Sequence, residues 1–222
     1  MATFADDFNN TGLPSGTPLD GYNGWKCYEF TTDALVEQEQ VPSPSWGAYL
    51  QNNRVEFYRA SGGAAGIQAL RQEEATDVDI TLVGAYTAYN QILARFSPTT
   101  GRADCYYHYH KTYYNPYTLI GRIVGGVSAT LGVQYHSGGA TATSRFVAQG
   151  ETLTAYTDGV QRVQVNDSAH VQGWFGFAPF TQGPLDIGWW DDFSATYTPV
   201  SGGGAAQSVF GPINSLGRRL IA

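Results

Sequence analysis

The sequence predicts an all-β protein built as a sandwich of antiparallel sheets. Short runs in which apolar and polar residues alternate recur along the 222 residues, and such alternation is typical of strands with one buried face. The 27 glycines, 15 tyrosines and only 14% charged residues fit many strands joined by tight turns. No segment has a convincing helical period. One β-sandwich domain of this length is common.

The first half of the chain contains six expected strands between turns and loops. Val41-Pro-Ser-Pro-Ser45 has the composition of a loop, and Asn52-Asn53 between two apolar runs predicts a hairpin turn. The most regular alternation places Val78, Ile80 and Leu82 on one face, where they would point into a core. The strands expected in this half span residues 25–30, 48–51, 54–58, 64–70, 76–83 and 89–96.

The second half contains eight further expected strands. Asp158-Gly159 separates two alternating runs, and this pair favours a type I′ hairpin because both turn residues adopt positive φ. The strand expected at residues 103–111 is unusually rich in tyrosine and histidine. The other strands span residues 117–124, 128–135, 143–147, 151–157, 160–165, 174–178 and 187–198.

The two ends of this region carry the same Asp-Asp-Phe triplet, at residues 6–8 and 191–193. Matching acidic and aromatic strands predict that the first and last strands lie side by side and close the core. In a regular strand one face of the last segment would hold Trp190, Asp192 and Ser194. The opposite face would hold Trp189, Asp191 and Phe193.

A separate segment follows the sandwich. The predicted sandwich domain spans residues 1–198 and ends at Thr198, just before Pro199. A glycine-rich linker follows over residues 199–206. Residues 207–222 combine apolar and basic side chains, as short segments do that dock into a groove or onto a sheet edge. The docking residues expected there are Val209, Phe210, Ile213, Leu216, Arg218, Arg219 and Leu220.

Charge and hydropathy argue against two kinds of partner. Lys and Arg number 12 against 19 Asp and Glu, a net charge of −7, whereas nucleic-acid binding needs a basic surface. No apolar run reaches the roughly 18 residues of a transmembrane helix, so no membrane insertion is expected. No signal peptide is visible either. Cys27 and Cys105 are predicted to be reduced, mostly buried thiols, with a disulfide as the alternative.

The order of these features resembles the concanavalin A-like lectin and glucanase superfamily. The matching landmarks are the two Asp-Asp-Phe triplets, Asp77-Val-Asp-Ile80, the Asp158-Gly159 turn, and Asp167-Ser168 before Gly173-Trp-Phe-Gly176. The resemblance covers roughly residues 3–198. It implies a jelly-roll sandwich of two curved antiparallel sheets, whose members include lectins, carbohydrate-binding modules, glycoside hydrolases and virion domains.

Sugar binding on a concave face is one expectation from this resemblance. In a strand, Tyr107 and Tyr109 share one face, while Tyr106, His108 and His110 share the other, so one set would fill the core. Rings on the open face would stack on sugars, and polar groups would bind hydroxyls. The candidate ligand-binding residues are Tyr107, Tyr109, His108, His110, Tyr113 and Tyr114.

The resemblance also implies a structural Ca²⁺ where the first and last strands meet. Its expected ligands are Asp6, Asp7, Asp191 and Asp192, since carboxylates and carbonyls suit a hard cation. No catalytic motif is present, and the Glu-x-Asp-x-x-Glu strand of the superfamily's glucanases is missing. Asp77 and Asp79 lie about 6.6 Å apart along one strand face, but alternating polar residues usually form a solvated face.

These features favour a non-enzymatic virion surface or structural protein, such as a phage decoration, fibre or host-contact module. Its tail would bind other virion proteins or other copies of the chain, and its concave face would bind cell-surface glycan. The alternative is a secreted or cell-surface carbohydrate-binding module or lectin, hence an extracellular protein. A glycoside hydrolase or lyase is the third hypothesis.

Overall fold

The computed structural model describes residues 1–9, 13–14, 17–31, 34–37, 46–59, 65–85, 89–97, 104–111, 115–137, 141–181 and 189–201. Residues 202–222 lie outside these ranges. The docking tail, from Val209 and Phe210 through Ile213, Leu216, Arg218, Arg219 and Leu220, therefore stays a prediction. No helix within the described ranges has the length and apolar character needed to cross a membrane.

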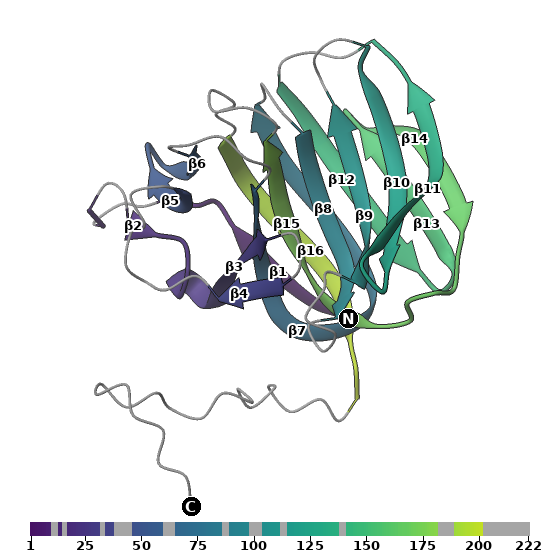
Figure 1. The fold of residues 1–222 in the computed structure, drawn as a ribbon, viewed down its shortest axis with the longest axis horizontal. Helices are drawn as coiled ribbons and strands as arrows, with labels where there is room; N and C mark the ends of the chain where they lie inside the picture. Colours follow the sequence, from purple (N-terminus) through teal and green to yellow (C-terminus); the bar gives the residue numbers. More distant parts are fainter. Residues whose placement is uncertain are drawn as a thin grey trace, which may run out of the picture.

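The described residues are nearly all in strands, as predicted, with one 3₁₀ turn at Tyr22–Gly24. Figure 1 shows their arrangement. The strands are β1 (Ala2–Asp6), β2 (Thr17–Pro18), β3 (Trp25–Thr31), β4 (Ala34–Glu37), β5 (Trp46–Gln51), β6 (Arg54–Arg59), β7 (Ala65–Ala85), β8 (Tyr89–Ser97), β9 (Asp104–Lys111), β10 (Tyr117–Val124), β11 (Val127–Tyr135), β12 (Thr141–Gln149), β13 (Thr152–Thr157), β14 (Val160–Asn166), β15 (Gly173–Thr181) and β16 (Trp189–Pro199).

One long strand, β7, belongs to both layers of the sandwich. Its residues 65–75 pair with β15 and β3, and its residues 75–85 pair with β12 and β16. Two strands expected at residues 64–70 and 76–83 are therefore continuous, because no Gly or Pro interrupts residues 71–76. Figure 1 shows β7 curving along the base of the molecule.

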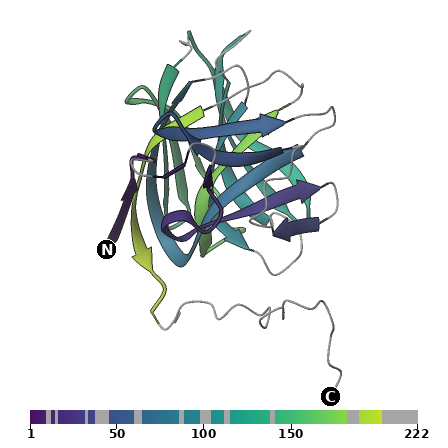
Figure 2. The same ribbon diagram turned by 90° about the vertical axis from the view of Figure 1, so that its left-hand side faces the viewer.

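The layers are referred to as sheet I and sheet II. Sheet I has the order β11-β10-β9-β8-β15-β7-β3-β4, and sheet II has the order β14-β13-β12-β7-β16-β1. Strands β6, β5 and β2 continue from the start of β16. Pairing of β1 with β16 confirms that the first and last strands are neighbours, and Figure 2 shows them side by side.

The main core fills the space between the two sheets. Val78, Ile80 and Leu82 are buried in it, as their alternation predicts. Trp25 is one of its two buried tryptophans among the described residues, and its ring centroid lies 5.0 Å from that of Phe177 and 4.9 Å from that of Phe193. Both pairs are edge-to-face, the arrangement that the charge distribution of aromatic rings favours.

Both predicted hairpins are present. Asn52 and Asn53 have φ of 55° and 56° between β5 and β6, while Asp158 and Gly159 have φ of 52° and 75° between β13 and β14. Two consecutive positive φ values define the type I′ turn, whose twist matches that of the flanking strands.

The predicted faces of β16 are wrong beyond Asp191. Trp190 and Phe193 were expected on opposite faces, yet both are buried, while Asp192 is exposed. A β-bulge between Asp191 and Phe193, with Asp192 at a φ of 45°, adds one residue and shifts the alternation. The two cysteines follow their prediction: Cys27 and Cys105 are free and buried. Burial raises the pKa of each thiol.

Candidate functional site

Alternation along β9 separates its histidines from two of its tyrosines. Tyr106 and His108 point toward sheet II: Tyr106 is fully buried, and the ring of His108 lies 6.0 Å from that of Phe146 in β12. Tyr107 and Tyr109 therefore point to the outer face of sheet I, the face turned away from sheet II. The aromatic strand thus contributes to both the core and the surface.

Tyrosines from three adjacent strands gather on this outer face. The ring centroid of Tyr109 lies 5.5 Å from that of Tyr117 in β10, which lies 5.6 Å from that of Tyr135 in β11. Lys111 places its Nζ 5.7 Å from the Tyr117 ring centroid. Exposure rises from 9% at Tyr109 to 69% at Tyr135. Tyr107, Tyr109, Tyr117 and Tyr135 are referred to as the tyrosine face.

Neighbouring strands fix the position of Tyr107. A Cβ atom at Gly121 of β10 would overlap the Tyr107 ring, so the absence of a side chain there makes room for it. The Tyr107 hydroxyl lies 2.7 Å from Ser128 Oγ in β11. A side chain held on two sides is already ordered before a ligand arrives, which lowers the entropic cost of binding.

A second aromatic group extends the outer face toward β3. The ring centroids of Tyr28 and Trp174 are 6.3 Å apart, and Gln72 Nε2 donates a hydrogen bond to the Tyr28 hydroxyl at 2.8 Å. These rings pack with Leu70, Leu93 and others in an apolar cluster distinct from the main core. This cluster is buried, so the exposed part of the outer face lies toward Tyr117 and Tyr135 rather than toward β3.

The other predicted ligand residues do not join the tyrosine face. His108 and His110 are each 1% exposed, and burial lowers the pKa of His108 to about 3 and that of His110 to about 4. Tyr113 and Tyr114 lie outside the described residues. Tyr135 was missed in the sequence, although it directly pairs with Tyr117 across the β10–β11 hairpin.

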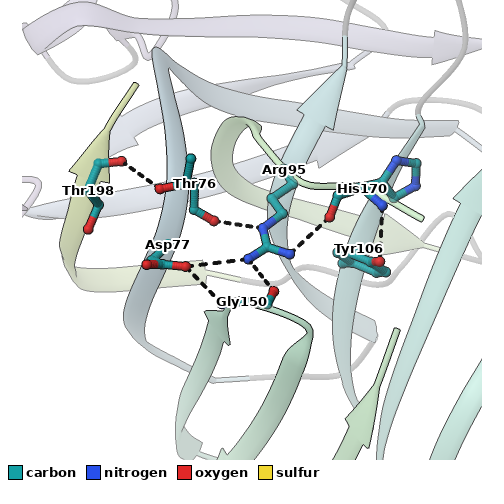
Figure 3. A network of polar contacts seen from close by, with 7 residues as sticks. All are labelled: Thr76, Asp77, Arg95, Tyr106, Gly150, His170 and Thr198. Atoms are coloured by element: carbon teal, nitrogen blue, oxygen red, sulfur yellow. Dashed lines mark hydrogen bonds and ion pairs between the residues drawn. The ribbon is translucent and has the colours of Figure 1, made fainter. Parts of the chain in front are cut away.

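A buried arginine organises the polar contacts around Asp77 (Figure 3). Arg95 is 2% exposed and donates to the carbonyl oxygens of Thr76, His170 and Gly150 at 2.8, 2.9 and 2.7 Å. Asp77 accepts from Gly150 N at 2.9 Å and lies 3.6 Å from Arg95 Nη2. The carboxylate of Asp77 therefore helps to fasten β7 and β8 to the β12–β13 turn.

Asp79 is engaged in the same way. Its two oxygens accept from Arg145 Nε and Nη2 at 2.7 and 2.6 Å. Both Asp77 and Asp79 lie in the part of β7 that belongs to sheet II, whereas the tyrosine face belongs to sheet I. These contacts favour a structural role for the two carboxylates.

Of the four aspartates predicted to bind calcium, Asp6 is already engaged by protein donors, and the calcium site itself stays a prediction. Asp6 Oδ2 accepts from Trp25 Nε1 at 2.9 Å and from Asn23 Nδ2 at 3.1 Å, and Oδ1 accepts from Phe8 N at 2.9 Å. A cation would have to replace these donors. Burial, with help from Asp192 and Asp7, raises the pKa of Asp191. The described residues contain no group of three His, Cys, Asp or Glu side chains that could hold a metal ion.

Comparison with known proteins separates fold from function. No protein-family model and no curated protein sequence matches the chain. The Ca²⁺- and mannose-bound VIP36 exoplasmic/lumenal domain has a TM-score of 0.58 at 11% identity, over 88% of this chain and 89% of that chain. Carbohydrate-binding module CBM66 from Bacillus subtilis has a TM-score of 0.50 at 11% identity, over 82% and 97%.

A third similar structure carries a description of endo-acting O-glycanases that members of the human gut microbiota express to initiate mucin breakdown. Its TM-score is 0.59 at 9% identity, over 87% of this chain and 98% of that chain. The chain has a concanavalin A-like β-sandwich fold. This confirms the predicted fold class. Because a concanavalin A-like sandwich hosts lectins and enzymes alike, the fold by itself does not choose between binding and catalysis.

Proposed function

We propose that the protein is a carbohydrate-binding domain that holds a glycan against its tyrosine face, outside the cytosol. The VIP36 domain was solved with mannose, and CBM66 is a carbohydrate-binding module. Both favour the lectin alternative of the sequence analysis over the virion function, which none of these similarities supports. The predicted docking tail at residues 207–222 is compatible with an extracellular lectin as well as with a virion protein.

The observation that carries this proposal is the run of three tyrosine rings across β9, β10 and β11. Their centroids are spaced by 5.5 and 5.6 Å, and they lie on a sheet face that the main core does not use. Aromatic rings offer flat apolar area for the C–H faces of sugars, with a hydroxyl for their polar edges, at little cost in conformational entropy. The Lys111 ammonium adds a hydrogen-bond donor beside Tyr117.

The test is a glycan array that includes mannose-terminated and mucin-type glycans, probed with the full chain. We expect wild type to bind and Tyr117→Ala to lose about tenfold in affinity, the effect of removing one well-placed aromatic contact. The control is Tyr156→Ala, which removes a tyrosine that packs on Arg145 in sheet II. No glycan bound by wild type, or equal affinity for Tyr117→Ala, would overturn the proposal.

The same array also separates binding from turnover. New reducing ends in the wells would identify a glycoside hydrolase and contradict a purely binding function. We expect none, because the two carboxylates nearest to a catalytic pair, Asp77 and Asp79, are held by Arg95 and Arg145 in sheet II.

A further inference from the structure

A cluster of histidines lies directly behind the tyrosine face. His108 and His110 point inward from β9, and His136 follows the end of β11. The ring centroids of His110 and His136 are 5.4 Å apart, and His136 Nε2 lies 3.0 Å from Thr118 Oγ1 of β10. These three residues are referred to as the histidine cluster.

The cluster and the tyrosine face share the same three strands. Tyr109 stands between His108 and His110, Tyr117 precedes Thr118, and Tyr135 precedes His136. Adjacent residues of a strand point to opposite faces but share one backbone. A displacement forced on the inner side of β9, β10 or β11 therefore displaces the rings on the outer side.

His108 is placed where a positive charge has no compensation. It is 1% exposed, and among the described residues neither ring nitrogen has a hydrogen-bond partner. Its neighbours across the ladder are Ile92 and Ile120, and it packs against the ring of Phe146. A buried imidazole in such surroundings strongly favours the neutral form.

The groups that face His110 and His108 mostly oppose protonation. Around His110, His136 and Arg162 disfavour a positive charge and Asp158 favours it, while around His108 both of the other histidines disfavour it. Neutral hydroxyls also lie close by: Ser144 Oγ is 3.4 Å from His110 Nδ1, and Thr118 bonds to Thr157 across the sandwich. The favourable effect of the Asp158 carboxylate on a protonated imidazole is therefore opposed by Arg162 and by the other histidines.

We propose that the histidine cluster makes the tyrosine face sensitive to acid: proton uptake by the buried imidazoles loosens β9, β10 and β11 and so releases the bound glycan. Release rests on the proposed function, whereas the loosening of the strands does not depend on it. The cluster thereby links the pH of the surroundings to the shape of the outer face.

The direction follows from linkage. The pKa of His108 is lowered from 6.5 to about 3 and that of His110 to about 4 in the folded protein. An opened state, with the ordinary pKa, takes up protons first as the pH falls. Stability is therefore unaffected well above pH 6.5 and decreases progressively as the pH drops from there toward these folded pKa values.

The test is hydrogen exchange of the full chain at about pH 7.5 and about pH 5, corrected for intrinsic exchange, with β1 and β16 as internal reference strands. We expect protection in β9–β11 of wild type to fall about tenfold more than in the reference strands. His108→Phe, which keeps an aromatic ring beside Phe146, should retain that protection. His170→Gln alters a histidine outside the cluster whose Nε2 lies 2.8 Å from the Ile123 carbonyl oxygen of β10, and its loss of protection between the two pH values should equal that of wild type. Equal behaviour of wild type and His108→Phe would overturn the proposal.

Direct titration of the wild-type histidines by NMR covers the case in which His108→Phe does not fold. We expect His108 to remain neutral at pH 5, and titration near its ordinary value of 6.5 would overturn the proposal. Mannose-terminated glycan loaded at about pH 7.5 should stay bound at about pH 5 and elute as the pH is lowered toward the folded pKa values of about 4 and about 3, where the protonated, opened state becomes populated. Absence of glycan binding at the higher pH would contradict the proposed function alone. Unchanged exchange at low pH would contradict acid sensitivity alone, and retention of the glycan at low pH would contradict release.

Discussion

A single residue, Arg95, joins three segments that are distant in the chain. Its guanidinium donates to carbonyls from β7, from the β12–β13 turn and from the segment before β15. Burial lowers its pKa, while Tyr106 and Asp77 oppose that shift. A fully buried cation is tolerated only where hydrogen-bond acceptors and an opposite charge compensate for its lost hydration. The carbonyl oxygens that accept from Arg95 in turn need its donors.

We expect Arg95→Met to lower the free energy of unfolding by about 3–5 kcal/mol, because three carbonyl oxygens lose a donor and Asp77 loses its ion-pair partner. Urea denaturation of the purified domain measures this. The control is Arg145→Met, which breaks the exposed pair with Asp79 and should cost less than about 1 kcal/mol. Similar losses in the two variants would contradict the structural importance of Arg95.

At the scale of elements, two glycines serve different purposes. Gly159 has a φ of 75° and no atom within 4 Å of a Cβ built on it, so only the backbone conformation requires glycine. Gly176 in β15 lies against β7, and a Cβ there would overlap the carbonyl oxygen of Ala69. The first glycine makes a turn, and the second allows two strands to approach closely.

The two glycines should therefore respond differently to alanine. Gly159→Ala is expected to lower the free energy of unfolding by about 1 kcal/mol, because a residue with a Cβ disfavours the left-handed backbone conformation. Gly176→Ala is expected to cost about 3 kcal/mol, because β15 or β7 must shift to relieve the overlap. Thermal and urea unfolding of both variants would test this, and an equal cost would show that β7 and β15 accommodate a methyl group freely.

Pairing between distant strands shaped the elements that sequence reasoning misjudged. The period-two pattern located most of the strands but did not predict β2 or β4. The union of residues 65–85 into one strand depends on pairing with β15, β3, β12 and β16. The bulge at Asp192 likewise appears only where β16 meets β7. A bulge adds a residue without changing composition, so local alternation cannot reveal it.

For the whole molecule, closure of the sandwich by β1 and β16 predicts that residues 1–201 fold without the residues that follow them. A chain that ends at residue 201 should unfold at the same urea concentration and with the same m-value as the full chain, because the core between sheets I and II is complete. A lower midpoint for the shortened chain would show that residues 202–222 pack on the sandwich.

The sequence alone determined the all-β class, the hairpin at Asn52-Asn53, the type I′ hairpin at Asp158-Gly159, the neighbouring first and last strands, the buried thiols and the division of β9 into two faces. The strands, the hairpins and the faces of β9 follow from periodicity and turn chemistry within a few residues. The neighbouring end strands follow instead from the repeated Asp-Asp-Phe triplet, and the buried thiols from the usual burial of free cysteine. Tertiary structure alone decided that Tyr135 joins Tyr117, that His108 and His110 are enclosed, and that Arg95 holds Asp77. Those contacts join residues far apart in the chain, and only the register between strands brings them together.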